Sequence, residues 1–191
     1  MKIIIVSPSP DQLQILGLIG IKPTPLSINI DEDLYQEIDP YKRIVSIARA
    51  KARIIAQTEK KAIIIAVDSY AYYRGQLIGK PKYKMEALSI LEKFSGKSHT
   101  FLSGWAIVKS STNQEYTGIS ETKITMNDLV HQELVDYVND HDVVKWTAGY
   151  HPLNTQAIYM VKKIEGSLTG FTHGLPLEMI YPILRKEHCF D

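Results

Sequence analysis

The fold is decided by the stretch Ala62-Ile63-Ile64-Ile65-Ala66-Val67-Asp68. An uninterrupted run of small and β-branched apolar residues is typical of a strand that is buried on both faces of a sheet. Lys2-Ile3-Ile4-Ile5-Val6 has the same character. Because helical patterns separate the two runs, the sequence predicts a mixed α/β fold in which helices pack on a central sheet.

Helical patterns lie on both sides of these runs. Ser9 and Gln12 have the spacing of a capping box and predict a helix over about residues 11–18. Asp39-Pro40 begins the longest pattern, which runs to about Thr58. Other helices are expected at about 85–95, 128–138 and 177–185, and other strands at about 26–30, 70–73, 76–78, 100–108, 116–126 and 156–164.

The totals fit a single domain of residues 1–191. Hydrophobic residues make up 45% of the chain and charged residues 23%, which is ordinary for a globular protein. Cys189 is the only cysteine, so neither an internal disulfide nor a cysteine metal site is expected. The net charge of +1 gives no reason to expect a nucleic-acid polymer or a membrane surface as partner. No apolar run has the length of a signal-peptide core or a membrane span, so the expected location is the cytoplasm.

Asp68 directly follows the apolar run and is the first candidate for chemistry. In open α/β sheets, ligands bind just beyond the carboxyl ends of the strands, so a carboxylate at a strand end would face a ligand. The competing interpretation is that Asp68-Ser69 caps a turn. Spacing alone supports the two interpretations equally.

Lys51 lies on the apolar face of the longest helix. It is seven residues after Ile44, so it points with the core-facing side chains, whereas Arg53 lies on another face. A lysine in this position meets an anion, such as a bound phosphate, Asp68 or Glu32. The alternatives are that it extends its ammonium to water or joins a purely structural ion pair.

Gly79-Lys80-Pro81 follows a predicted strand, and its Gly and Pro fix the direction of the lysine between them. It is not a Walker A loop, because Pro81 cannot supply the hydroxyl needed after the lysine. Carboxylates hold Mg²⁺ or Mn²⁺ and lysines offset phosphate charge, so the two carboxylates and two lysines together indicate phosphate chemistry with a divalent metal. The histidines lack zinc-ligand spacing, and neither a nucleophile elbow nor a dinucleotide-binding motif is present.

A longer series of motifs runs through the chain in a fixed order. Its members are Ser7-x-Ser9, Asp31-Glu32, Ala48-x-x-Lys51-Ala52, Val67-Asp68-Ser69, Gly79-Lys80-Pro81, Phe94-Ser95-Gly96-Lys97-x-His99, Ser103-Gly104, Glu121-Thr122, Lys145, Ala148-Gly149, Glu165-Gly166 and Gly174-Leu175-Pro176. Each motif is short, but the series spans nearly the whole chain. In this order and at this spacing it resembles the Maf-like nucleotide pyrophosphatases.

The resemblance implies a fold, an activity and a set of site residues. The fold is an elongated mixed sheet flanked by helices, with two lobes around a deep cleft, commonly in a homodimer. The activity is hydrolysis of nucleoside triphosphates, often noncanonical or pyrimidine ones, to the monophosphate and pyrophosphate with Mg²⁺ or Mn²⁺. Asp68 would be the base or a metal-organising carboxylate, and Glu32 would join it at the metal. Lys51 and Lys80 would hold the phosphates. Further substrate contacts are implied for Ser7, Ser9, Ser69, Lys97 and Asn154.

One loop departs from the family pattern. The arginine pair that members usually carry after the first-loop serines is replaced by Asp11 and Gln12, which removes bidentate phosphate contacts. A nucleotide-binding homologue with weak or no turnover therefore stays open as an alternative. So does a pyrophosphatase of the related inosine-triphosphate type, although Gly79-Lys80-Pro81 and Ser95-Gly96-Lys97 favour the Maf-like family.

Overall fold

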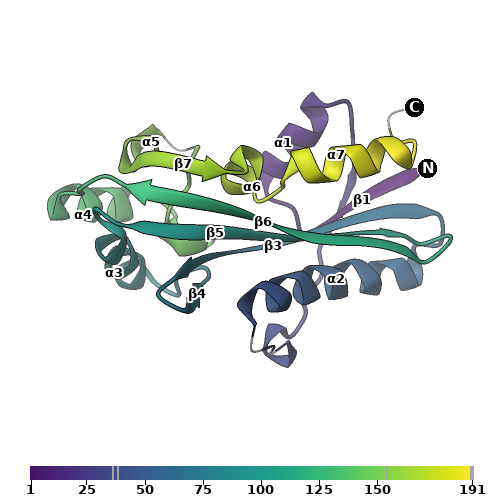
Figure 1. The fold of residues 1–191 in the computed structure, drawn as a ribbon, viewed down its shortest axis with the longest axis horizontal. Coiled ribbons are helices and arrows are strands. Elements are labelled where there is room, and N and C mark those ends of the chain that lie inside the picture. Colours follow the sequence, from purple (N-terminus) through teal and green to yellow (C-terminus); the bar gives the residue numbers. More distant parts are fainter. Residues whose placement is uncertain (36, 38, 154, 190–191) are drawn as a thin grey trace. The chain divides into compact units, whose positions relative to one another are not determined.

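The computed structural model describes residues 1–35, 37, 39–153 and 155–189 (Figure 1). Within them the chain forms a sheet of seven strands in the order β2-β1-β3-β5-β6-β7, with β4 paired to β3. The strands are β1 (Lys2–Val6), β2 (Thr24–Leu26), β3 (Ala62–Tyr73), β4 (Gln76–Ile78), β5 (Ser98–Lys109), β6 (Gln114–Met126) and β7 (Val161–Gly166). The helices are α1 (Pro10–Leu18), α2 (Pro40–Thr58), α3 (Lys84–Phe94), α4 (His131–Asp140), α5 (Thr155–Met160), α6 (Leu168–His173) and α7 (Leu177–Lys186), with 3₁₀ turns η1 (Glu32–Leu34), η2 (Val143–Lys145) and η3 (Thr147–Gly149). The predicted mixed α/β fold with a central sheet flanked by helices is confirmed.

Two compact units make up this fold. The first contains residues 1–68, 103–120 and the C-terminal segment from His173 on, and the second contains residues 69–102 and 121–172. The chain passes from one unit to the other inside β3, β5 and β6, and again at the end of α6. Each unit has an apolar core of its own. Within the described residues, no helix is both long enough and apolar enough to cross a lipid bilayer.

The first unit buries both faces of β1, β3 and β5, because alternate side chains of a strand point to opposite faces. Figure 1 shows α2 on one side of these strands and α1 and α7 on the other. The strand side chains in the core on the α2 side are Ile4, Val6, Ala62, Ile64, Ala66, Ala106 and Val108. Those on the side of α1 and α7 are Ile5, Ile63, Ile65, Trp105 and Ile107. The burial on both faces predicted for 62–67 is confirmed for 62–66, whereas Val67 is only partly buried. Each fully buried isoleucine contributes roughly 1.5–3 kcal/mol to folding.

Asp68 lies inside β3, and the prediction that the strand ends there is wrong. β3 pairs in parallel with β1 over 62–66 and antiparallel with β4 over 71–73. The strand continues because β4 becomes its partner after β1 has ended at Val6. Asp68 therefore lies between the two pairings, just beyond the carboxyl end of β1.

Two other predicted strands differ from the observed elements. β2 ends at Leu26 and not at Ile30, because its partner β1 ends at the residue that pairs with Leu26. The predicted strand over 156–164 begins instead with α5, where Ala157 and Met160 are buried three residues apart, as on one helix face. A short apolar run allows either structure, and only β7 has strand geometry.

The core of the second unit encloses a polar side chain, His99. This residue is 3% exposed, its ring stacks on Phe94 with 4.0 Å between ring centroids, and its Nε2 shares a 2.8 Å hydrogen bond with the Tyr150 hydroxyl. Among the described residues, the buried Nδ1 has no hydrogen-bond partner. Burial lowers the pKa of His99 from 6.5 to about 3, since surroundings of low dielectric constant disfavour the charged ring.

We expect acid to destabilise the protein through His99. The unfolded chain protonates this side chain near pH 6.5 and the folded chain only near pH 3, so its contribution to stability is complete above pH 6.5 and is lost as the pH falls toward 3. At pH 5 the loss relative to pH 7 should be about 2 kcal/mol. Urea unfolding of the wild type and of His99→Gln at both pH values measures it. An equal loss in the two proteins would show that His99 is not responsible.

Candidate active site

Three of the charged side chains expected at the site meet in the first unit. The Lys51 ammonium donates a 2.8 Å hydrogen bond to Asp68 Oδ1 and a 2.9 Å hydrogen bond to Glu32 Oε1. The side chains of Lys51 and Asp68 are each 13% exposed, and that of Glu32 is 38% exposed. The prediction that Lys51 turns toward the core and meets an anion is confirmed, and the anions are these two carboxylates.

The helix that carries Lys51 is seated by two local features. Asp39 caps its N-terminus, because Asp39 Oδ1 accepts a 2.9 Å hydrogen bond from the backbone N–H of Tyr41. One turn later, Ile44 contacts β5 at Gly104, where an added Cβ would lie 2.7 Å from Ile44 Cγ2 and 2.9 Å from its carbonyl carbon. Only glycine permits so close an approach. The Ser103-Gly104 motif thus sets the distance between α2 and the strands.

Glu32 is presented by the 3₁₀ turn η1. Asp31 caps this turn by accepting a 3.1 Å hydrogen bond from the backbone N–H of Asp33. Such side-chain caps are a common reason for a short acidic segment to turn. The acidic stretch therefore has a structural role in addition to the contact that Glu32 makes with Lys51.

The surroundings keep Lys51 charged. Burial by itself would lower its pKa, but the charge of Asp68 and the hydrogen bonds to Asp68 and Glu32 outweigh burial and raise the pKa above its usual 10.5. The side chain is therefore an ammonium ion at neutral pH. Its charge compensates part of the carboxylate charge in a site that is partly shielded from water.

Arg53 lies on another face of α2, as predicted, and so does Arg49. Both pair with Glu115 of β6, and their side chains remain 46% and 51% exposed. Exposed ion pairs of this kind contribute about 0–1 kcal/mol to stability. Arg53 is therefore a matched control for Lys51, because it is a cation on the same helix that pairs elsewhere.

The polar side chains of the first loop fix the loop itself. Ser7 Oγ donates to Ile28 O (3.3 Å) and accepts from Ile28 N (3.2 Å). Ser9 Oγ accepts from Gln12 N (3.3 Å), and Gln12 Oε1 accepts from Ser9 N (3.1 Å), which completes the predicted capping box. Gln12 is 8% exposed, and its Nε2 also donates to His173 O (2.9 Å). At position 12, where the resemblance implies an arginine, this chain has a glutamine whose amide group stabilises the loop.

Lys80 belongs to the second unit, in the loop after β4. The loop is fixed by the neighbouring turn at 147–149, because Ala148 N donates a 2.8 Å hydrogen bond to Gly79 O. A Cβ on Gly149 would lie 2.8 Å from Ala87 Cβ, so the turn also packs tightly on α3. Two motifs far apart in the sequence therefore support the same loop. The Lys80 side chain itself is exposed.

Ser69 and Lys97 also belong to the second unit. Ser69 O accepts a 3.4 Å hydrogen bond from Thr147 Oγ1, and Lys97 is exposed in the turn between α3 and β5. Asn154 lies outside the described residues. Of the four expected catalytic residues, the first unit brings together three, and Lys80 is part of the second.

The donor set of Glu32 and Asp68 fits a divalent cation. Each directs one oxygen at the same nitrogen, so the two carboxylates already converge on one positive charge. Mg²⁺ is commonly bound by one or two carboxylates together with substrate phosphates. Among the described residues, no group of three or more His, Cys, Asp or Glu side chains could hold a metal. A cation here would therefore complete its coordination with phosphate and water oxygens.

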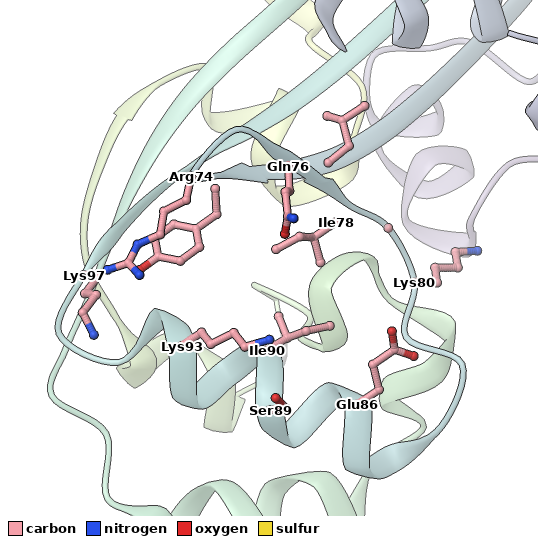
Figure 2. Close-up of a pocket in the computed structure, with 12 residues that line it drawn as sticks. Arg74, Gln76, Ile78, Lys80, Glu86, Ser89, Ile90, Lys93 and Lys97 are labelled. Carbon is pink, nitrogen blue, oxygen red and sulfur yellow. The ribbon is translucent and has the colours of Figure 1, made fainter. Parts of the chain in front are cut away.

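Two cations of the second unit, Arg74 and Lys93, were not predicted from the sequence as part of a site. Arg74 and Lys93 line a pocket together with Lys97 (Figure 2). Lys93 is in the last turn of α3 and Lys97 lies in the turn that follows, so helical periodicity gives no signal for the pair. That Arg74 lies beside them follows only from the folding of the β3–β4 hairpin.

Comparison with known proteins identifies the fold and then the family. The structure of a HAM1 protein from Coxiella burnetii matches with a TM-score of 0.52 and 16% identity over 97% of this chain and 100% of that one, so the two share a fold. A family model described as Maf-like protein matches residues 2–187. A dTTP/UTP pyrophosphatase of Geobacillus sp. (strain WCH70) is 31% identical over 92% of each chain. One of Dictyoglomus turgidum is 30% identical over 97% of this chain and 95% of its own. The chain belongs to the Maf-like protein family.

The stability of the protein should depend on the contact between Lys51 and the two carboxylates. Lys51→Met keeps most of the side-chain volume but removes the charge, and it should lower the free energy of unfolding by roughly 3 kcal/mol. Adding Asp68→Asn should restore at least about 1 kcal/mol of this loss. Urea unfolding of the two single variants and the double variant provides the measurement. Strict additivity would mean that the two side chains do not interact.

Proposed function

We propose that this chain is a nucleoside-triphosphate pyrophosphatase that releases a nucleoside monophosphate and pyrophosphate. The observation that carries the proposal is the Lys51 ammonium held between Asp68 and Glu32 in a member of the Maf-like family. Two relatives matched over 92% and 97% of the chain are dTTP/UTP pyrophosphatases. We therefore propose pyrimidine nucleoside triphosphates as the substrates.

The proposed reaction is attack of a water oxygen on the α-phosphorus. The bond from this phosphorus to the bridging oxygen breaks, and its electron pair leaves with pyrophosphate. Asp68 accepts the proton that the water loses. Lys51 offsets the phosphate charge as it develops, and Lys80 of the second unit stays a predicted phosphate contact. A divalent cation, Mg²⁺ or Mn²⁺, held by Glu32 and Asp68 would supply further charge compensation.

Several finer points are part of the same proposal. Ser7, Ser9, Ser69, Lys97 and Asn154 stay predicted substrate contacts. We further propose that the whole chain acts as one catalytic domain, in a homodimer in the cytoplasm. Its substrate would be a free nucleotide and not a nucleic-acid polymer, in keeping with a net charge of only +1.

Release of pyrophosphate from a panel of nucleoside triphosphates, with Mg²⁺ or Mn²⁺, tests the proposal. dTTP and UTP should be hydrolysed, and Asp68→Asn should lower kcat by at least about a hundredfold, because the proton acceptor is lost. Lys51→Ala should lower kcat/KM by about a hundredfold. Turnover confined to deaminated purine nucleotides would instead assign the inosine-triphosphate type.

Arg53→Ala is the matched control for Lys51→Ala. It removes a cation from the same helix but leaves Asp68 and Glu32 untouched, so its activity should remain close to that of the wild type. Equal losses in the two variants would refute the role of Lys51. The comparison also shows whether activity depends on Lys51 itself or on the total positive charge of α2.

The second candidate is a nucleotide-binding protein without turnover. It is favoured by the first loop, where Asp11 adds negative charge and Gln12 is committed to the helix cap. Neither side chain can replace a guanidinium that binds phosphate. Nucleotide binding without pyrophosphate release, on every member of the panel, would select this candidate.

A further inference from the structure

The second unit contains a pocket of about 520 Å³ between the β3–β4 hairpin and α3 (Figure 2). This volume is within the range of about 300–1,000 Å³ that is usual for small-molecule sites. Part of the wall is apolar and consists of Leu77, Ile78 and Ile90. The pocket therefore offers a surface for an organic molecule as well as for an ion.

Several cations line this pocket. Figure 2 shows Arg74 and Lys97 at one end, Lys93 with its ammonium turned toward Ile90, and Lys80 at the far end, pointing away from the others. The carboxylate among the lining side chains, that of Glu86, accepts a 2.6 Å hydrogen bond from the backbone N–H of Lys82. The end near Arg74 is thus positively charged.

Arg74 is held in place by the hairpin. Arg74 and Gly75 form the two-residue turn of the hairpin with φ values of 50° and 83°, a conformation that matches the twist of the flanking strands. The guanidinium lies over the ring of Tyr73, 5.2 Å from its centroid. That ring in turn packs edge-on against Phe94. The cation is therefore oriented before any ligand binds.

We propose that this pocket binds a small phosphorylated organic molecule, as a second site in addition to the proposed active site. The phosphate would lie against the Arg74 guanidinium, and the Lys93 ammonium, which is turned toward Ile90 (Figure 2), would contribute further positive charge, because a guanidinium fork and ammonium groups are the usual partners of phosphate. The organic part would cover Ile78 and Ile90. A bare phosphate ion would fill only a small part of 520 Å³.

Two probes separate the possible sources of the phosphate, UMP and inorganic pyrophosphate. Each is titrated into isotopically labelled full-length protein, and the backbone amide signals are followed by NMR. UMP should shift the signals of Gln76, Ser89 and Ile90, and should bind more tightly than pyrophosphate because it also covers the apolar wall. Equal affinities would overturn the organic part of the proposal.

Variants separate this pocket from the site in the first unit. The double variant Arg74→Gln, Lys93→Gln should weaken binding by at least about tenfold, as expected for loss of hydrogen bonds to a charged group. Lys162→Gln is the control, because Lys162 is also exposed and does not line the pocket. It should leave the affinity unchanged, and Asp68→Asn should do so as well.

Two results would overturn the proposal. One is the absence of shifts around the pocket with either probe at millimolar concentration. The other is binding that survives the double variant but is lost in Asp68→Asn, which would assign the phosphate to the first unit. Because the readout is local binding, a pocket without affinity is distinguishable from a protein without pyrophosphatase activity.

Discussion

The ammonium group of Lys51 holds together the charged centre of the first unit. It joins three segments, since Lys51 lies on α2, Asp68 on β3 and Glu32 on the turn η1. In a partly shielded site, two neighbouring carboxylates would repel one another, and a buried lysine would tend to lose its proton. The lysine charge reduces the repulsion between the carboxylates, and the carboxylates keep the lysine protonated. The result is a site in which acidic and basic groups are fixed close together in their charged forms, which is what phosphate chemistry needs.

The fold serves this contact by burying both faces of the central strands. Alternation in β1, β3 and β5 covers one face with α2 and the other with α1 and α7, so β3 is fixed from both sides. Gly104 then sets the height of α2 above the strands. Many residues of the family motifs likewise stabilise the fold. Gly149 packs on α3, the Ser95 hydroxyl bonds the backbone of Leu129, and His99 is enclosed by aromatic rings.

The features that could be predicted from the sequence are those that depend on local periodicity. The apolar run at 62–67 predicted a strand buried on both faces, and the position of Lys51 on its helix predicted an inward cation. Features that depend on a distant partner could not be predicted. β3 continues past Asp68 because β4 pairs with it. Gln12 has a structural role because its Nε2 donates a hydrogen bond to the carbonyl oxygen of His173, which is distant in the sequence. The basic end of the pocket likewise requires the hairpin to fold beside α3.

The order of the segments along the chain also affects how the protein can form during synthesis. The second unit uses only residues 69–102 and 121–172, so all of its chain has been made before α7 emerges. The first unit begins with β1, but the side of its sheet formed by Ile5, Ile63 and Ile107, which α1 covers in part, is complete only when α7 has been made. An apolar surface made early must therefore wait until α7 has been synthesised. Such a surface is prone to aggregation or chaperone binding, so the second unit is expected to fold first although it is encoded in the middle.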